Sequence, residues 1–281
     1  MRISLSNLAW DPGFDEEVAS LLANHGVDAI DVVPTKYFPA LAGATALELR
    51  AVRRAWEARC VEIVGMQALL YGTHGLNLFG DAAAQDAMLE HLTHVARVGA
   101  ALGAKFLVFG SPRNRDRSGI DDAAVEVMAR SFFTRLGDVA HQHDVVFCLE
   151  PNAAASGANF MTNTLDTAAV VEAVAHPNIA MQLDTGVLTT NAEIPAVAVA
   201  RSEQLVRHIH ASEPGLVPLG EGSTAHPIIA QLIAEHLSNR IVTVEMLCPR
   251  EPARHALQQI DRALALATAT YGPADQGSHG R

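Results

Sequence analysis

The sequence predicts one α/β domain, a single (β/α)8 TIM barrel that spans residues 1–271. Strand-like apolar runs alternate with amphipathic helix-like segments along the whole chain, which is the pattern of parallel strands joined by helical crossovers. The 281 residues suit a barrel, which takes about 250. Apolar residues make up 49% and aromatic residues 5%, so aliphatic side chains must fill the large core that this fold requires.

Eight predicted strands are each followed by a predicted helix. The strands are residues 2–8, 28–34, 61–69, 104–111, 144–151, 179–185, 205–211 and 240–247. The helices are residues 14–25, 44–59, 80–102, 121–143, 164–175, 191–204, 224–237 and 250–271. An open doubly wound sheet is the main alternative, but it places a glycine-rich phosphate loop after the first strand, and residues 8–13 are not one. Residues 272–281 are polar and glycine-rich, and we predict a disordered tail there.

The composition argues against several classes of protein. The formal net charge is −11 and the sequence has no block of Lys or Arg, which disfavours a nucleic-acid partner. No run approaches the roughly 18 to 20 apolar residues that cross a bilayer, and the first predicted strand is not preceded by a secretory signal. The three cysteines lack CxxC spacing. We therefore expect a cytoplasmic protein with free thiols and no membrane partner, whose exposed outer helices leave room for a homo-oligomer.

Four successive predicted strands end in a residue that can bind a metal. These residues are Glu150, Asp184, His210 and Glu245. Since side chains alternate between the two faces of a strand, each of the four lies on the more polar face of its run. Helices cover the apolar face in a barrel, so the polar face looks inward. The carboxyl ends of successive parallel strands meet at one end of the barrel, and the four side chains should converge there.

Carboxylates that point into a barrel need a compensating charge, because an unpaired buried charge costs several kcal/mol or more. One divalent cation would supply it. Three carboxylates and one imidazole suit Mn2+, Mg2+ or Co2+, with Zn2+ less characteristic, and we expect one such ion, with Mn2+ favoured. The alternative is that these are ordinary polar residues at strand ends, hydrogen-bonded to helix N-termini.

The segments around these residues resemble a known family. They are Leu149-Glu150-Pro151-Asn152, Leu183-Asp184-Thr185-Gly186, His208-Ile209-His210 and Val244-Glu245-Met246. In their order and spacing the chain resembles the xylose-isomerase-like TIM-barrel superfamily, the group of sugar isomerases and epimerases. The resemblance implies that Glu150, Asp184, His210 and Glu245 bind the metal. It also implies that Glu150 and Glu245 are the catalytic pair, which transfers a proton through the enediolate of a sugar or sugar derivative.

Two positions depart from the sugar epimerases of that group. Val187 stands where they often carry a His that contacts the substrate, and Leu216 stands where some carry an Arg. These changes keep open a metal-dependent dehydratase or lyase, in which the same base starts a β-elimination, and a non-catalytic sugar-binding protein. A nuclease of the same fold is disfavoured, since it would need about three metals and more inward-facing ligands than this acidic chain offers.

Other residues are candidates for the surroundings of the metal. Substrate contacts are expected from Trp10, Gln67, His74, Arg113 and Asn152. Arg113 lies nearest the fourth strand in an Arg-rich segment and would anchor an anionic group, although a solvated loop explains that segment equally well. His208 and Glu213 are expected to support the ligands from behind, with His208 one pleat deeper than His210.

Overall fold

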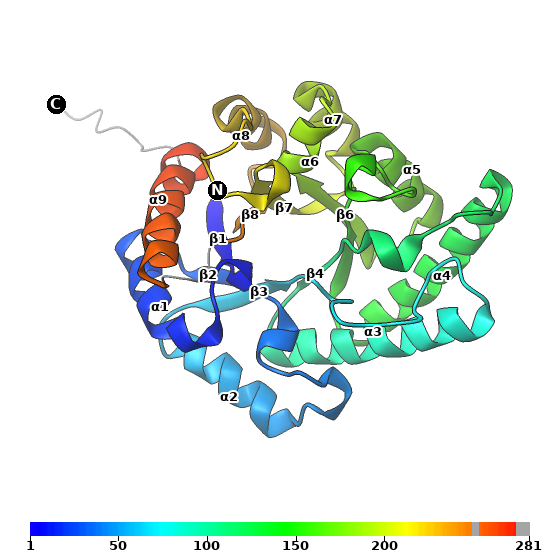
Figure 1. The fold of residues 1–281 in the computed structure, drawn as a ribbon, viewed down its shortest axis with the longest axis horizontal. Coiled ribbons are helices and arrows are strands. Elements are labelled where there is room, and N and C mark those ends of the chain that lie inside the picture. Colours follow the sequence, from blue (N-terminus) through cyan, green and yellow to red (C-terminus); the bar gives the residue numbers. More distant parts are fainter. Residues whose placement is uncertain (249–252, 274–281) are drawn as a thin grey trace.

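The computed structural model describes residues 1–248 and 253–273. Eight parallel strands form a closed barrel in chain order, and β8 pairs with β1 to complete it, as Figure 1 shows. The strands are β1 (Arg2–Ser6), β2 (Ala29–Val32), β3 (Glu62–Met66), β4 (Phe106–Phe109), β5 (Val146–Leu149), β6 (Ile179–Asp184), β7 (Val206–Ser212) and β8 (Ile241–Glu245). The predicted (β/α)8 barrel is confirmed.

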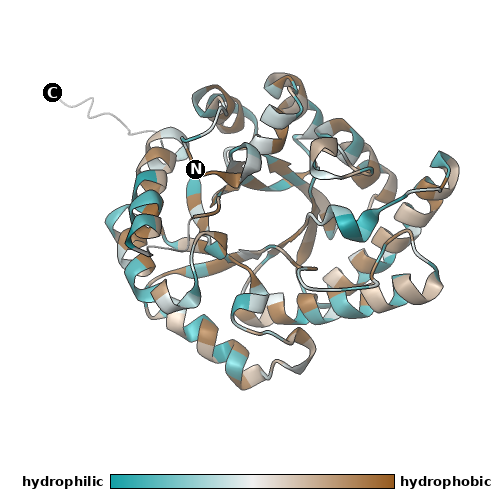
Figure 2. Cartoon of the chain, viewed as in Figure 1, coloured by the Kyte–Doolittle hydropathy of each residue, from teal (hydrophilic) through white to brown (hydrophobic). Residues whose placement is uncertain are grey.

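Helices surround the barrel on the outside (Figure 1). They are α1 (Asp15–Asn24), α2 (Ala46–Glu57), α3 (Ala82–Leu102), α4 (Asp122–Gln142), α5 (Thr164–Val174), α6 (Thr185–Thr190), α7 (Pro195–Ser202), α8 (His226–His236) and α9 (Ala253–Tyr271). Hydrophobic and hydrophilic residues alternate along them (Figure 2). None of the described helices is both long enough and apolar enough to cross a membrane.

Helix α3 illustrates why these segments become helices. Its buried side chains include Met88, Leu92 and Val95, a spacing of three to four residues that forms one apolar stripe toward the strands. Asp81 accepts a hydrogen bond from the backbone N–H of Ala84 and caps the first turn. Gly103 ends the helix with a φ of 92°, which a residue without a Cβ adopts at little cost.

The structure differs from the sequence prediction after β6. The helix expected over residues 191–204 is observed as α7, and an additional short helix, α6, precedes it. The carboxylate of Asp184 accepts a hydrogen bond of 2.7 Å from the backbone N–H of Val187, so a helix begins directly at the end of the strand. Of the predicted tail, only Gly272 and Pro273 lie among the described residues.

The interior of the barrel is polar, whereas the layer between strands and helices is aliphatic. Ser4, Asp31, Gln182, His208 and Thr243 are fully buried on the strands. Their neighbours along the chain, such as Ile30 and Ile209, belong to the apolar core under the helices. Strand register places Asp184 of β6 beside His210 of β7, and Ser212 of β7 beside Glu245 of β8. The fold thereby gathers the strand-end side chains at one end of the barrel.

Candidate active site and metal centre

The structure brings the four predicted metal ligands together. One ligand atom from each of Glu150, Asp184, His210 and Glu245 lies within 4.8 Å of all the others. The Nδ1 atom of His210 is 3.2 Å from Oε1 of Glu150 and 3.3 Å from Oε2 of Glu245. All four residues are at least nine-tenths buried. Consecutive strand ends thus supply three carboxylates and one imidazole around a single point.

This cluster fits a divalent cation. Oε1 of Glu150 and Nδ1 of His210 are buried and have no hydrogen-bond partner among the described residues. Buried polar atoms are nearly always satisfied in native proteins, and these two atoms, 3.2 Å apart, could both bind one ion. Carboxylate oxygens with one imidazole nitrogen are donors that Mn2+, Mg2+ and Co2+ accept.

Burial and neighbouring charges shift the pKa values of two residues in the cluster. Burial raises the pKa of Asp184 to about 7, and repulsion from Glu150 and Glu245 adds to this effect. Burial alone would lower the pKa of His210, but the charge of Glu245 and the nearby carboxylates of Asp31 and Glu150 raise it well above its usual value. Protons therefore partly compensate the negative charge that a metal ion would neutralise.

Two side-chain amides hold the two glutamates. Nε2 of Gln67 donates to Oε1 of Glu245 at 2.5 Å, and Nδ2 of Asn152 donates to Oε2 of Glu150 at 3.3 Å. In each glutamate the other oxygen approaches His210. Gln67 and Asn152 were predicted to contact substrate. Both line a cavity of about 500 Å3 at the cluster, but their observed partners are the carboxylates of Glu245 and Glu150. Each amide orients one glutamate toward the cluster.

Arg115 supports the Glu150 side of the site, and sequence reasoning missed it. Its guanidinium is fully buried, donates to the backbone carbonyl of Glu150 at 2.8 Å and also donates to Oδ1 of Asn152. Burial lowers the pKa of Arg115 to about 10, while the charge of Glu150 opposes this shift. Arg113, the arginine chosen from the sequence, is exposed and is not among the residues that line the cavity.

A glycine at the end of β4 makes room for Glu150. A Cβ atom at Gly110 would lie 1.9 Å from Oε2 of Glu150, far inside van der Waals contact. Only a residue without a side chain leaves the carboxylate in its observed place.

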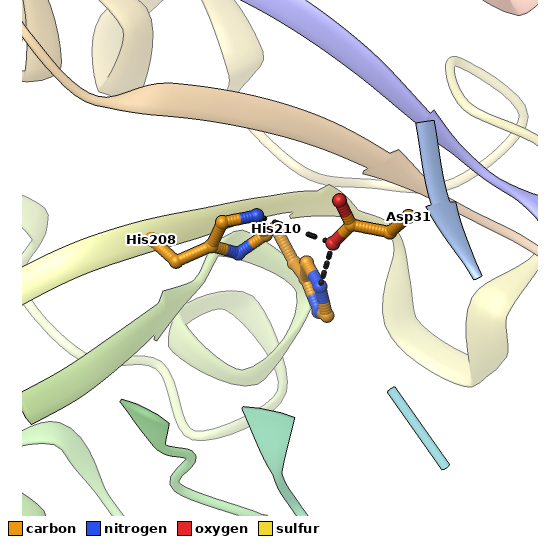
Figure 3. A group of neighbouring side chains, drawn as sticks. All are labelled: Asp31, His208 and His210. Carbon is orange, nitrogen blue, oxygen red and sulfur yellow. Dashed lines mark ion pairs between the residues drawn. The ribbon is translucent and has the colours of Figure 1, made fainter. Parts of the chain in front are cut away.

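Below the cluster lies a buried group of three side chains, Asp31, His208 and His210, drawn in Figure 3. Oδ2 of Asp31 is 3.1 Å from Nε2 of His208 and 3.8 Å from Nε2 of His210. Burial would raise the pKa of Asp31, but the charge of His208, which approaches it at 3.1 Å, and the charge of His210 hold that pKa below its usual value. His208 also contacts the amide of Gln182 at 3.0 Å. It therefore supports His210 through Asp31. Asp31 was not predicted from the sequence. The signal that could have found it is an acid within the otherwise apolar run of β2.

Of the remaining sequence candidates, Trp10 and His74 do not line the cavity at the cluster, whereas Glu213 does. Trp10 donates from Nε1 to Asp15 at 2.8 Å and lines a neighbouring cavity. His74 is exposed and lines neither cavity. Glu213 is buried and accepts hydrogen bonds from the backbone N–H groups of Gly220 and Thr224. It holds the loop after β7 and makes no observed contact with His210.

A cavity of about 500 Å3 opens over the ligand cluster. Its wall includes all four ligands, Gln67 and Asn152, and it also includes Val187 and Leu216. None of the described residues in this wall is Lys or Arg. The two positions that depart from the sugar epimerases therefore face the same space as the ligands and present apolar surface to it.

A closed parallel barrel with a ligand cluster at the carboxyl ends of its strands defines the class of TIM-barrel proteins whose active site lies at that end. Within this class the chain belongs to the xylose isomerase-like TIM barrel family, whose model matches residues 19–266. The family resemblance noted in the sequence is thus confirmed. No curated protein matches the sequence significantly.

Solved structures of a sugar epimerase, the IOLI protein and a probable dehydratase share the fold. D-psicose 3-epimerase with D-tagatose from Clostridium cellulolyticum H10 superposes with a TM-score of 0.82 at 14% identity, covering 97% of this chain and 100% of that one. The IOLI protein with a bound zinc atom gives 0.74 at 16% identity, covering 96% and 98%. The probable 3-DHS dehydratase AsbF from Bacillus anthracis gives 0.72 at 14% identity, covering 95% and 99%. At these identities the likeness establishes the fold.

Proposed function

We propose that this protein is a divalent-metal-dependent isomerase or epimerase that moves a proton within a ketose or ketose derivative. The observation that carries the proposal is the ligand cluster, in which atoms of Glu150, Asp184, His210 and Glu245 lie within 4.8 Å of one another. The adjoining cavity of about 500 Å3 has the size of a small-molecule site. The fold shared with D-psicose 3-epimerase supports the same class of reaction.

A divalent ion, with Mn2+ favoured, would act as a Lewis acid that polarises the substrate carbonyl and acidifies the neighbouring C–H. Glu150 and Glu245 come from different strand ends and both approach the same ring nitrogen of His210. One of them removes the proton to give an enediolate, and the other returns a proton from its own side. Return to the same carbon inverts it, and return to the adjacent carbon interconverts aldose and ketose.

The amides of Gln67 and Asn152 define which oxygen of each glutamate is free to act. Each donates to one carboxylate oxygen, and the other oxygen of each glutamate approaches His210. Arg115 in turn holds Asn152. The protein thereby positions both bases before substrate arrives, and a positioned base is the main requirement of this chemistry.

Val187 favours one alternative, a dehydratase or lyase on the same site. It is partly buried in the cavity wall, and a valine neither hydrogen-bonds a sugar hydroxyl nor relays a proton. In a β-elimination the base removes a proton from one carbon, and the substrate loses a leaving group from the next carbon. No proton is then returned to a carbon of the substrate. AsbF, a probable dehydratase, has the same fold.

The first experiment measures metal content and proton exchange together. The purified chain is reconstituted with Mn2+, Mg2+, Co2+ or Zn2+, and metal per chain is determined for the wild type and for Asp184→Asn. The asparagine keeps an oxygen for the N–H of Val187 while it removes one ligand charge. Asp166→Asn, an exposed acid in the first turn of α5, is the matched control.

The expected result is about one ion per chain in the wild type and the control, and strong loss in Asp184→Asn. Ketoses in D2O then gain deuterium without loss of water if the reaction is isomerisation or epimerisation, and an unsaturated product reveals elimination. Absence of metal binding after reconstitution would refute both the isomerase or epimerase and the dehydratase or lyase.

A further inference from the structure

A second cavity, of about 530 Å3, adjoins the one over the ligand cluster. We call it the side chamber. Leu8, Ala68 and Tyr71 line both cavities, so the two share a wall at the same end of the barrel. The side chamber lies over the ends of β1, β2, β3 and β8 and the start of α9. The four predicted ligands lie at the carboxyl ends of β5 to β8.

The wall of the side chamber is mainly apolar. Trp10 and Phe14 contribute to it from the connection between β1 and α1, Leu247 from the segment after β8, and Leu257 from α9. Tyr71 is 73% exposed and Leu247 is 49% exposed, which extends apolar surface to the rim. Exposed large apolar side chains gathered beside a cavity mark a binding region more often than isolated ones do.

Among the described residues of its wall, the side chamber offers no charge that is directed at an anion. Lys36 is the one basic side chain among the described residues of its wall. Its ammonium donates to the backbone carbonyls of Asn7 at 2.6 Å and Trp10 at 2.5 Å, and lies 3.7 Å from a carboxylate oxygen of Asp11. The lysine charge is thereby used to hold the loop after β1.

We infer that the side chamber is a subsite for an apolar, ring-sized substituent on the sugar, so that the substrate is a ketose derivative such as an aryl or alkyl ether that keeps its carbonyl free. This inference rests on the proposed function, because it assumes that the ketose part binds beside the ligand cluster. The metal-side cavity alone is large enough for a monosaccharide. The two cavities together approach the upper end of the range of about 300–1,000 Å3 typical of ligand sites.

The apolar side chains over the ligand cluster point to the same substrate. Val187 and Leu216 line the metal-side cavity, which removes hydrogen-bonding partners for free hydroxyl groups. Together with the absence of Lys and Arg from the described wall of that cavity, this disfavours a sugar phosphate. A neutral substrate with one polar end for the ligand cluster and one apolar end for the side chamber fits both cavities.

The test compares three probes by calorimetry on the full chain loaded with Mn2+: D-fructose, 6-O-benzyl-D-fructose and D-fructose 6-phosphate. Burial of a phenyl ring should make the benzyl ether bind roughly 10- to 100-fold more tightly than D-fructose. Ala256→Trp would fill the chamber from α9, and Ala265→Trp on the exposed side of the same helix is the control. The preference for the benzyl ether should fall to near unity in the first variant and persist in the second.

The outcomes separate the two proposals. Equal affinity for D-fructose and the benzyl ether, tighter binding of the phosphate, or binding of none of the probes would each overturn the side chamber as an apolar subsite. Deuterium exchange measured on the same ligands reports on the reaction. A benzyl preference that Ala256→Trp abolishes, without exchange on any ligand, would support the subsite while refuting the proposed isomerase.

Discussion

Replacement of Arg115 by methionine tests how the Glu150 side of the site is held. Arg115 donates to the carbonyl of Glu150 at 2.8 Å and to the side chain of Asn152. Methionine has similar length and fills the space, but it leaves both buried oxygens without a donor, at about 1–3 kcal/mol each. Removal of a fully buried charge returns part of that cost. We expect a net loss of about 2 kcal/mol in the free energy of unfolding.

The assay combines thermal unfolding with Mn2+ titration, and Arg113→Met is the matched control. A loss of about 2 kcal/mol lowers the Tm of a chain of 281 residues by about 3 °C. Since Asn152 also loses its partner, affinity for Mn2+ should fall by about 10- to 100-fold. The exposed Arg113 should change the free energy of unfolding by less than about 0.5 kcal/mol. Equal effects in the two variants, or no effect of Arg115→Met, would refute this account.

Three further predictions concern the ligand cluster. Gln67→Leu should lower kcat by about tenfold, because Glu245 loses the donor at 2.5 Å that orients it; initial rates of deuterium exchange measure this, and an unchanged kcat would contradict it. Asp31→Asn should weaken Mn2+ binding by about tenfold. Asp28 is an exposed acid paired with Arg2, and the control Asp28→Asn should leave Mn2+ binding unchanged; Mn2+ titration of both variants measures the difference, and equal affinities would contradict the prediction. Affinity for Mn2+ should rise at least about tenfold from about pH 6 to about pH 8, because burial and like charges raise the pKa of Asp184 to about 7 and its proton must leave before metal binds. Chelator competition measures that slope, and a flat profile would show that this proton does not compete.

Much of the barrel was predictable because its signals are local. Period-two alternation along each strand placed Asp184 and His210 on the inward face, and the structure puts them side by side in register. Amphipathic spacing gave the long helices, such as α3. Helix α6 was not predicted, because its start depends on the side chain of Asp184 turning to cap Val187, which a periodicity argument does not contain.

The missed residues act through contacts between distant parts of the chain. Arg115 was one of three arginines in a polar segment, and only the path of that loop buries it against the strand end that carries Glu150. Asp31 had a local signal, an acid within an apolar strand, but its partner His208 lies five strands later. Burial of a polar side chain follows from the closed barrel, so its role becomes visible only when the strands are in place.

The two nitrogens of His210 face different partners, and this explains why the site needs the deeper acid. Nδ1 faces Glu150 and Glu245 at 3.2 and 3.3 Å, whereas Nε2 faces Asp31 at 3.8 Å. A neutral imidazole carries its proton on one nitrogen only. An ionised Asp31 favours that proton on Nε2, which leaves the lone pair of Nδ1 for a cation. Because β3 has glycine at position 65, where a Cβ would lie 2.6 Å from the oxygens of Asp31, the barrel accommodates this acid and so selects the ligating form of His210.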